Sequence, residues 1–127
     1  MPAVLASADV AIFPNRCEAG TNLVAMEAMA SGVPSILSYN TGHLDLIKQD
    51  NCLRLLKMSP SQPFAHYSGV SGWMEPEVDE MVEALEKVYI NSKEIDRMAK
   101  KAHKSLQSFN WKKQVSYLME VIDSKAF

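Results

Sequence analysis

Two glutamates, Glu18 and Glu27, flank the part of this chain whose residue types best suit ligand binding. The residues between them, Ala-Gly-Thr-Asn-Leu-Val-Ala-Met, combine a short polar loop with an apolar run. Carboxylates accept hydrogen bonds from hydroxyl groups, and backbone N–H groups at the start of a helix bind phosphates. This order of groups favours a ligand whose phosphates rest on the amides of residues 21–23, with Glu18 at one end and Glu27 bonded to hydroxyls at the other.

A strand and a helix are predicted to position this loop. The apolar residues 10–13 form a short strand, which ends at Pro14 because proline has no N–H for a sheet hydrogen bond. Thr21 or Asn22 can cap a helix over residues 23–30, since a short side-chain oxygen accepts an N–H group of the first turn. Gly32 and then Pro34 end that helix. The loop is therefore expected at the carboxyl edge of an α/β sheet, where nucleotide phosphates commonly bind.

Glu27 is the only charged residue of this predicted helix, which is apolar on every face. Such a helix is expected to be buried, and a buried carboxylate needs a hydrogen-bonding or ionic partner. Two interpretations stay open. In the first, Glu27 lies at an edge, where it is solvated or pairs with a cation. In the second, it accepts hydrogen bonds from the ligand.

The same stretch resembles the donor-binding segment of retaining glycosyltransferases with two Rossmann domains, the GT-B architecture, and is most similar to glycosyltransferase family 4. The resemblance rests on residues 18–34, Glu-Ala-Gly-Thr-Asn-Leu-Val-Ala-Met-Glu-Ala-Met-Ala-Ser-Gly-Val-Pro, with Ala-Asp-Val before them and Thr41-Gly42 after them. Members of the family usually have seven residues between the two glutamates, whereas this chain has eight. Glu27 therefore aligns directly with the second glutamate of the family motif. Glu18 aligns with the first glutamate when one extra residue is allowed in the loop.

The resemblance implies a role for each residue of the segment. Glu18 contacts and orients the donor sugar in catalysis, and Glu27 binds the ribose hydroxyls. No nucleophilic role is assigned to Glu18, because nothing in the sequence places it beside the anomeric carbon. The amides of the loop and of the helix start hold the diphosphate, and the residues concerned are Gly20, Thr21, Asn22 and Leu23. Neither a metal nor a cofactor is implied.

The composition is that of an ordinary globular domain, with 47% hydrophobic and 22% charged residues and a net charge of −2 over 127 residues. Because there is no basic run, nucleic acid and anionic membranes are not expected as partners. Cys17 and Cys52 lack metal or redox spacing, which is typical of reduced thiols in a cytoplasmic protein. No signal peptide or membrane span is visible.

Two further strands, residues 35–38 and 53–57, are predicted to lie beside the first in a parallel sheet. The turn-forming residues 39–43 follow the second strand and are expected at the same edge as the Glu18 loop. His43 could contact a ligand, but a lone histidine in such a loop is more often solvated. Residues 44–48 resemble the short helix that follows this loop in the family, so a short helix is expected there.

The second half of the chain is predicted to be a loop followed by helices. Residues 59–72, rich in Ser, Pro and Gly, are interpreted as a surface loop partly anchored by its aromatic residues, Phe64, Tyr67 and Trp73. Pro76 is expected at the first position of a helix. The apolar stripe of that helix is Val78, Met81, Val82, Leu85, Val88 and Tyr89. Further helices are expected over residues 93–108 and from Trp111 onward.

These elements predict an α/β fold of about three parallel strands covered by helices. The resemblance makes residues 1–127 one partial domain, the second half of the Rossmann-like C-terminal domain that binds the donor in GT-B enzymes. The first half of that domain and the acceptor domain are then expected to be missing from this chain. The first strand would lie at an open apolar edge, which predicts a homodimer through that edge.

The implied function is transfer of a sugar from a nucleotide-diphosphate sugar to a hydroxyl of a glycan or small acceptor, with retention, in glycan or polysaccharide biosynthesis. The alternative is a non-catalytic binding or assembly module, or a truncated fragment that is inactive alone. An upstream reading frame that encodes the other Rossmann half would favour the enzyme, and a true start at Met1 would favour the module.

Overall fold

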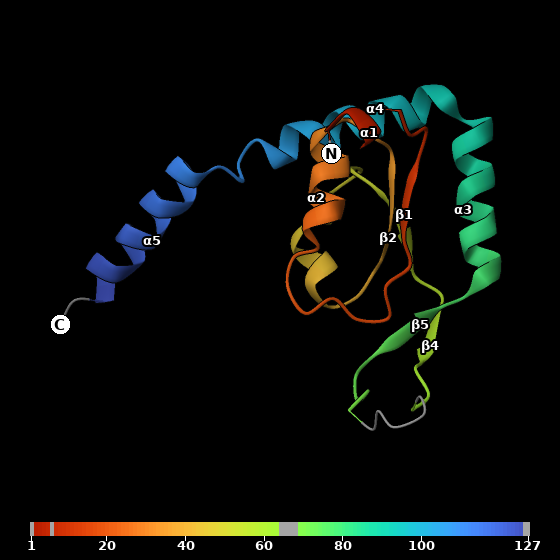
Figure 1. Ribbon diagram of the computed structural model, residues 1–127, viewed down its shortest axis with the longest axis horizontal. Coiled ribbons are helices and arrows are strands. Elements are labelled where there is room, and N and C mark those ends of the chain that lie inside the picture. The colour runs from red at the N-terminus through yellow and green to blue at the C-terminus, as the bar shows by residue number, and fades with distance from the viewer. Residues whose placement is uncertain (1, 6, 64–68, 126–127) are drawn as a thin grey trace.

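The structure is a computed structural model of the chain and describes residues 2–5, 7–63 and 69–125. Its first half contains α1 (Pro2–Leu5), β1 (Ala11–Phe13), α2 (Leu23–Ala30), β2 (Ser35–Ser38), the 3₁₀ helix η1 (Thr41–Asp45) and β3 (Leu53–Leu55) (Figure 1). Its second half contains β4 (Met58–Pro60), β5 (Met74–Pro76), α3 (Val78–Ile90), α4 (Ser92–Leu106) and α5 (Trp111–Lys125). The predicted α/β fold class is confirmed.

The three predicted strands form one parallel sheet in the order β1-β2-β3. Ile12 of β1 lies opposite Ile36 of β2, and Leu37 of β2 lies opposite Arg54 of β3. All four residues of β2 are buried, as expected of a central parallel strand with both faces covered. Within the described residues β1 is an edge strand, and dimerisation through it stays a prediction.

One cluster of buried residues joins α2, α4 and the sheet. Its members are Ala25, Met29, Leu37, Leu46, Cys52, Ala102 and Leu106. Burial raises the pKa of the Cys52 thiol to about 11, so this thiol is protonated at neutral pH. Neither Cys52 nor Cys17 forms a disulfide. The cluster fixes α2, and therefore the start of α2, against the sheet.

The prediction that α2 is buried on every face is wrong. Ala25, Ala28 and Met29 are buried, but 74% of Leu23 is exposed and Glu27 is exposed as well. A uniformly apolar sequence has no periodic contrast, so it does not indicate which face of the helix points outward. Because Glu27 lies in solvent, it needs no protein partner to offset a cost of burial.

The predicted surface loop of residues 59–72 is partly strand. β4 and β5 form an antiparallel ribbon in which Ser59 lies opposite Glu75. Pro76 is the last residue of β5, and α3 begins at Val78 with Glu77 as its N-cap. Strands of three residues are too short to show alternation in the sequence. Of the aromatic residues expected to anchor the loop, Trp73 is 39% exposed, and Phe64 and Tyr67 lie outside the described residues.

Three other predictions need correction. The strand expected over residues 53–57 ends at Leu55, and the short helix expected over 44–48 is η1, which begins earlier, at Thr41. On α3 the predicted apolar stripe is only partly covered. Met81 and Val88 are half-buried, whereas the other four stripe residues, Val78, Val82, Leu85 and Tyr89, are exposed. Across the described ranges, no helix has the length and apolar character needed to cross a membrane.

Candidate functional site

The loop that carries Glu18 and the start of α2 lie at the carboxyl ends of the parallel strands. Figure 1 shows this loop at the same end of the molecule as the β4–β5 ribbon. Ligands of open α/β sheets bind at this edge. The candidate residues therefore lie at the edge of the sheet where they were predicted. The site is built from three segments, residues 15–27, residues 38–43 and the ribbon.

Asn22 is the N-cap of α2, and Thr21 is not. The Asn22 Oδ1 accepts a hydrogen bond from the Ala25 N–H at 3.0 Å, and the Asn22 carbonyl accepts one from the Met26 N–H at 3.0 Å. The backbone φ of Asn22 is +28°, in a region that asparagine tolerates better than most residues. The cap leaves the Asn22 amide nitrogen free to bond to a second group.

That second group is His43, which is fully buried. The Asn22 Nδ2 donates to the His43 Nε2 at 2.8 Å, and the His43 Nδ1 donates to the Ser38 carbonyl at 3.1 Å. The interpretation of His43 as a solvated side chain is therefore wrong. Burial lowers the pKa of His43, although the Ser38 carbonyl and the charge of Glu18 both act to raise it. A neutral imidazole with its proton on Nδ1 satisfies both contacts.

Because residue 42 is a glycine, the backbone of the Glu18 loop can lie in direct contact with the backbone of η1. The Gly42 N–H donates to the Glu18 carbonyl at 3.2 Å, and the Glu18 N–H donates to the Thr41 Oγ1 at 2.8 Å. A Cβ atom on Gly42 would overlap the Gly20 carbonyl oxygen, so only glycine fits here. The Glu18 carboxylate, on a half-buried residue, accepts a hydrogen bond from the Asn15 Nδ2 at 3.0 Å.

Asn40 joins the same loop to the β4–β5 ribbon. Its Nδ2 lies 3.0 Å from the Asn15 carbonyl oxygen and 3.1 Å from that of Arg16. The Arg16 carbonyl also accepts from the Met74 N–H at 3.0 Å, and the Arg16 guanidinium pairs with Glu75 at 2.8 Å. Sequence reasoning missed Asn40, Gly42 and His43 as supports of the loop. Two signals were available: residues 39–43 were predicted at this edge, and Thr41-Gly42 belong to the resemblance.

The remaining candidate residues are exposed, apart from Thr21. Gly20 is exposed, with no heavy atom within 4 Å of the position that its Cβ would occupy, and Thr21 is half-buried. Within the described residues, the N–H groups of residues 19–24 donate to no protein acceptor. These amides at the positive end of α2 are thus available to an anion. Glu18 and Asn22 belong to the hydrogen-bonded network, whereas Glu27 takes no part in it.

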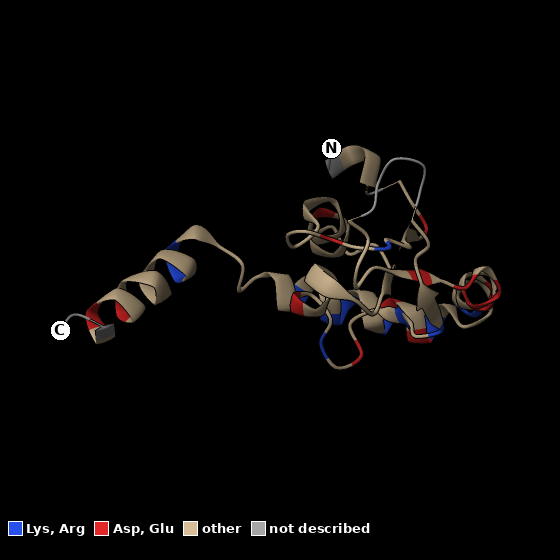
Figure 2. Cartoon of the chain, turned by 90° about the horizontal axis from the view of Figure 1, so that it is seen from below, with Lys and Arg blue, Asp and Glu red and all other residues tan. Residues whose placement is uncertain are grey.

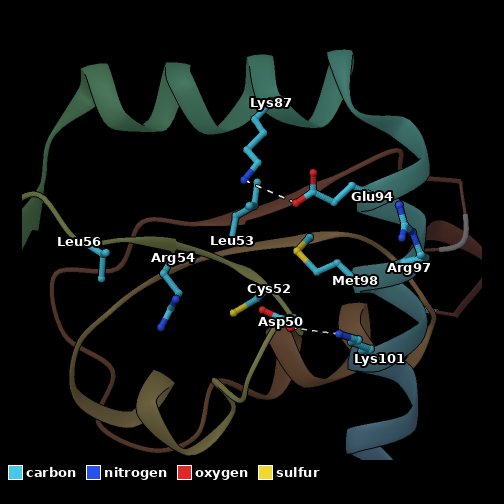
Figure 3. A pocket seen from close by; sticks show the side chains of 10 residues that line it. All are labelled: Asp50, Cys52, Leu53, Arg54, Leu56, Lys87, Glu94, Arg97, Met98 and Lys101. Carbon is cyan, nitrogen blue, oxygen red and sulfur yellow. Dashed lines mark hydrogen bonds and ion pairs between the residues drawn. The ribbon is translucent and has the colours of Figure 1, made fainter.

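A separate cavity of about 490 Å³ lies between β3, α3 and α4 (Figure 3). Two ion pairs cross it, Lys101–Asp50 at 3.1 Å and Lys87–Glu94 at 3.9 Å. The other lining residues are Cys52, Leu53, Arg54, Leu56, Arg97 and Met98. None of these residues belongs to the Glu18 loop or to α2. In the part of the chain that the structure describes, no three His, Cys, Asp or Glu residues are grouped to hold a metal ion.

A family model described as family 4 glycosyltransferase in conflict systems matches residues 1–118, nearly the whole chain. No curated protein sequence matches the chain. Together with the Rossmann-like arrangement of strands and helices, the match assigns a glycosyltransferase-like role. The chain belongs to this family of family 4 glycosyltransferases in conflict systems, which confirms the resemblance found at residues 18–34.

Proposed function

We propose that residues 18–27 form the donor half-site of a retaining glycosyltransferase that uses a nucleotide-diphosphate sugar. One observation carries most of the weight. The start of α2 is held by Asn22 and His43, and the N–H groups of residues 19–24 have no acceptor among the described residues, with the half-buried Glu18 before them and the exposed Glu27 after them. Fixed donors of this kind suit a diphosphate, because they need no rearrangement when the anion binds.

Each group then has a chemical task. The backbone amides of Gly20, Thr21, Asn22 and Leu23 bind the diphosphate and stabilise the negative charge that grows on it as the glycosidic bond breaks. The exposed Glu27 accepts hydrogen bonds from the ribose hydroxyls. Glu18 orients the donor sugar, with its backbone held by Thr41 and Gly42. The acceptor is a hydroxyl of a glycan or small molecule, and the anomeric configuration is retained.

The pathway is proposed from the family description. Family membership alone fits glycan or polysaccharide biosynthesis, but the matching family is described as acting in conflict systems. We therefore propose that the sugar transfer of this chain takes place in a conflict system rather than in glycan or polysaccharide biosynthesis.

A thermal-shift scan tests the half-site. UDP, GDP, ADP and their sugar conjugates are added to the wild-type chain, to Glu27→Ala and to the control Asp96→Ala, which removes an exposed carboxylate of α4. A nucleotide at about 100 times its dissociation constant adds roughly 2.7 kcal/mol to the free energy of unfolding, or several degrees in midpoint. We expect one nucleotide to stabilise wild type and Asp96→Ala, and to stabilise Glu27→Ala much less.

The sugar of the nucleotide provides a sharper comparison. If Glu27 binds ribose hydroxyls, wild type prefers the ribonucleotide over the matching deoxyribonucleotide, and Glu27→Ala loses that preference. An equal response of all three proteins to every nucleotide would contradict the role proposed for Glu27.

A further inference from the structure

Asn40 is a buried polar side chain on which carbonyl oxygens from two segments converge. Only 6% of this residue is exposed. Its Nδ2 lies 3.0 Å from the Asn15 carbonyl oxygen, 3.1 Å from that of Arg16 and 3.4 Å from that of Met74. Because carbonyl oxygens only accept hydrogen bonds, they fix which end of the side chain carries the nitrogen. The Asn40 amide therefore ties the residues just before Glu18 to β5.

The same side chain is connected to Glu18 by two routes. On the first, Asn40 bonds to the Asn15 carbonyl, and the Asn15 Nδ2 donates to the Glu18 carboxylate at 3.0 Å. On the second, the Asn40 Oδ1 accepts a hydrogen bond from the Thr41 hydroxyl at 3.3 Å. The Thr41 Oγ1 in turn accepts one from the Glu18 N–H at 2.8 Å. One buried side chain thus supports both the backbone and the carboxylate of Glu18.

A different set of contacts holds the groups proposed to bind the nucleotide. The start of α2 is held by the hydrogen bonds among Asn22, His43 and the Ser38 carbonyl, none of which involves Asn40. Figure 2 views the molecule from the end where the Glu18 loop lies and shows α5 extending away from it. The sugar end and the nucleotide end of the proposed site are therefore positioned by separate side chains.

We infer that Asn40 is a positioning residue for the donor sugar. It contacts no donor, because its side chain is buried and both of its polar atoms are bonded to protein groups. It holds Glu18 where the carboxylate meets the sugar, so it contributes to the part of donor binding that depends on the sugar. This inference rests on the function proposed for residues 18–27.

Paired affinities separate the sugar from the nucleotide. The Kd of a nucleoside diphosphate is divided by the Kd of its sugar conjugate, both measured by titration calorimetry of the full chain. The pairs are UDP with UDP-glucose, GDP with GDP-mannose and ADP with ADP-glucose, and the pair that binds wild type most tightly is used for every variant. A substitution that only lowers the folded fraction weakens both ligands equally, so it leaves this ratio unchanged.

Glu18→Ala is expected to lower the ratio about tenfold, and Asn40→Ala about fivefold, as for the loss of a hydrogen bond to a charged group. The double variant is expected to lower the ratio no further than Glu18→Ala does, because Asn40 acts through Glu18. The matched control is Asn51→Ala, at another buried asparagine, whose Nδ2 donates to the Leu46 carbonyl at 2.9 Å. It should lower the thermal midpoint and leave the ratio unchanged.

Thr41 tests the second route without removing a buried side chain, because this residue is exposed. Thr41→Val keeps the shape of the side chain but removes the hydroxyl, whereas Thr41→Ser keeps the hydroxyl. We expect Thr41→Val to lower the ratio about threefold and Thr41→Ser to retain the wild-type ratio. Circular dichroism checks that each variant is folded.

The outcomes distinguish this inference from the function on which it rests. If Glu18→Ala lowers the ratio but Asn40→Ala and Thr41→Val do not, the inference is overturned and the proposed donor site stands. If Glu18→Ala leaves the ratio unchanged as well, the role of Glu18 is overturned together with the inference. If no pair binds to the wild-type chain, the proposed function itself fails, and the inference fails with it.

Discussion

Gly42→Ala is expected to lower the free energy of unfolding by about 3 kcal/mol, because the new methyl group meets backbone that cannot move independently. A Cβ at this position would overlap the Gly20 carbonyl oxygen, lie 2.7 Å from the Gly20 carbonyl carbon and lie 3.0 Å from the Glu18 carbonyl oxygen. To relieve the overlap, the Glu18 loop must separate from η1. The hydrogen bond from the Gly42 N–H to the Glu18 carbonyl would then be lost.

Denaturant unfolding measures this effect, and Gly20→Ala is the matched control. Gly20 belongs to the same crossing of backbones, but a Cβ there has no atom within 4 Å. We expect Gly20→Ala to change stability by only a few tenths of a kcal/mol. Equal stability of the two variants would show that the close approach of Gly42 to the loop does not exist in solution.

The second large effect is expected at His43. His43→Leu removes the acceptor of the Asn22 amide and the donor to the Ser38 carbonyl. Each polar group left unpaired in a buried setting costs about 1–3 kcal/mol, so the free energy of unfolding is expected to fall by about 2–4 kcal/mol. His43→Gln, which keeps hydrogen-bonding capacity, is expected to recover part of this loss. A variant His43→Leu as stable as wild type would contradict the proposed support of α2.

The same residue predicts a pH dependence. Because burial lowers the pKa of His43 below 6.5, the unfolded chain takes up this proton before the folded chain does. The stabilising contribution is complete above pH 6.5 and is lost as the pH falls through the pKa of the folded state. Wild type should therefore lose stability on acidification, and His43→Gln should lack this component. The variant His103→Gln, at an exposed histidine of α4, should keep it.

The elements that were predicted correctly are marked by residues close to them in the sequence. The bounds of α2 were predicted from a cap before it and a glycine after it, and both act as expected. Asn22 bonds to the first turn, and Gly32 has a φ of +77° with the Val33 N–H bonded to the Ala28 carbonyl at 3.0 Å. The strand of residues 35–38 was equally clear, because Ile36 and Leu37 lie between Pro34 and the turn-forming residues 39–43.

Contacts between distant segments explain what the sequence did not reveal. His43 bonds to Asn22 across 21 positions of the chain, and Asn40 bonds to the Glu18 loop across 24 or 25 positions. No local pattern marks these pairs, since each residue by itself is an ordinary turn residue. The position of Glu27 stayed open between a solvated edge and a ligand contact for a different reason: the helix around it is apolar on every side and therefore gives no indication of its outer face.

Nuclear magnetic resonance of the backbone amides, recorded while a nucleoside diphosphate is added to the wild-type chain, tests the donor half-site most directly. The nucleotide is the one that stabilises the chain most in the thermal scan, or UDP if none does. We predict that the largest shifts fall on the amides of residues 19–24, that Glu27→Ala weakens the binding, and that Asp96→Ala leaves it unchanged. Absence of shifts at residues 19–24, or shifts confined to the cavity between β3, α3 and α4, would contradict the assignment of this loop as the donor site.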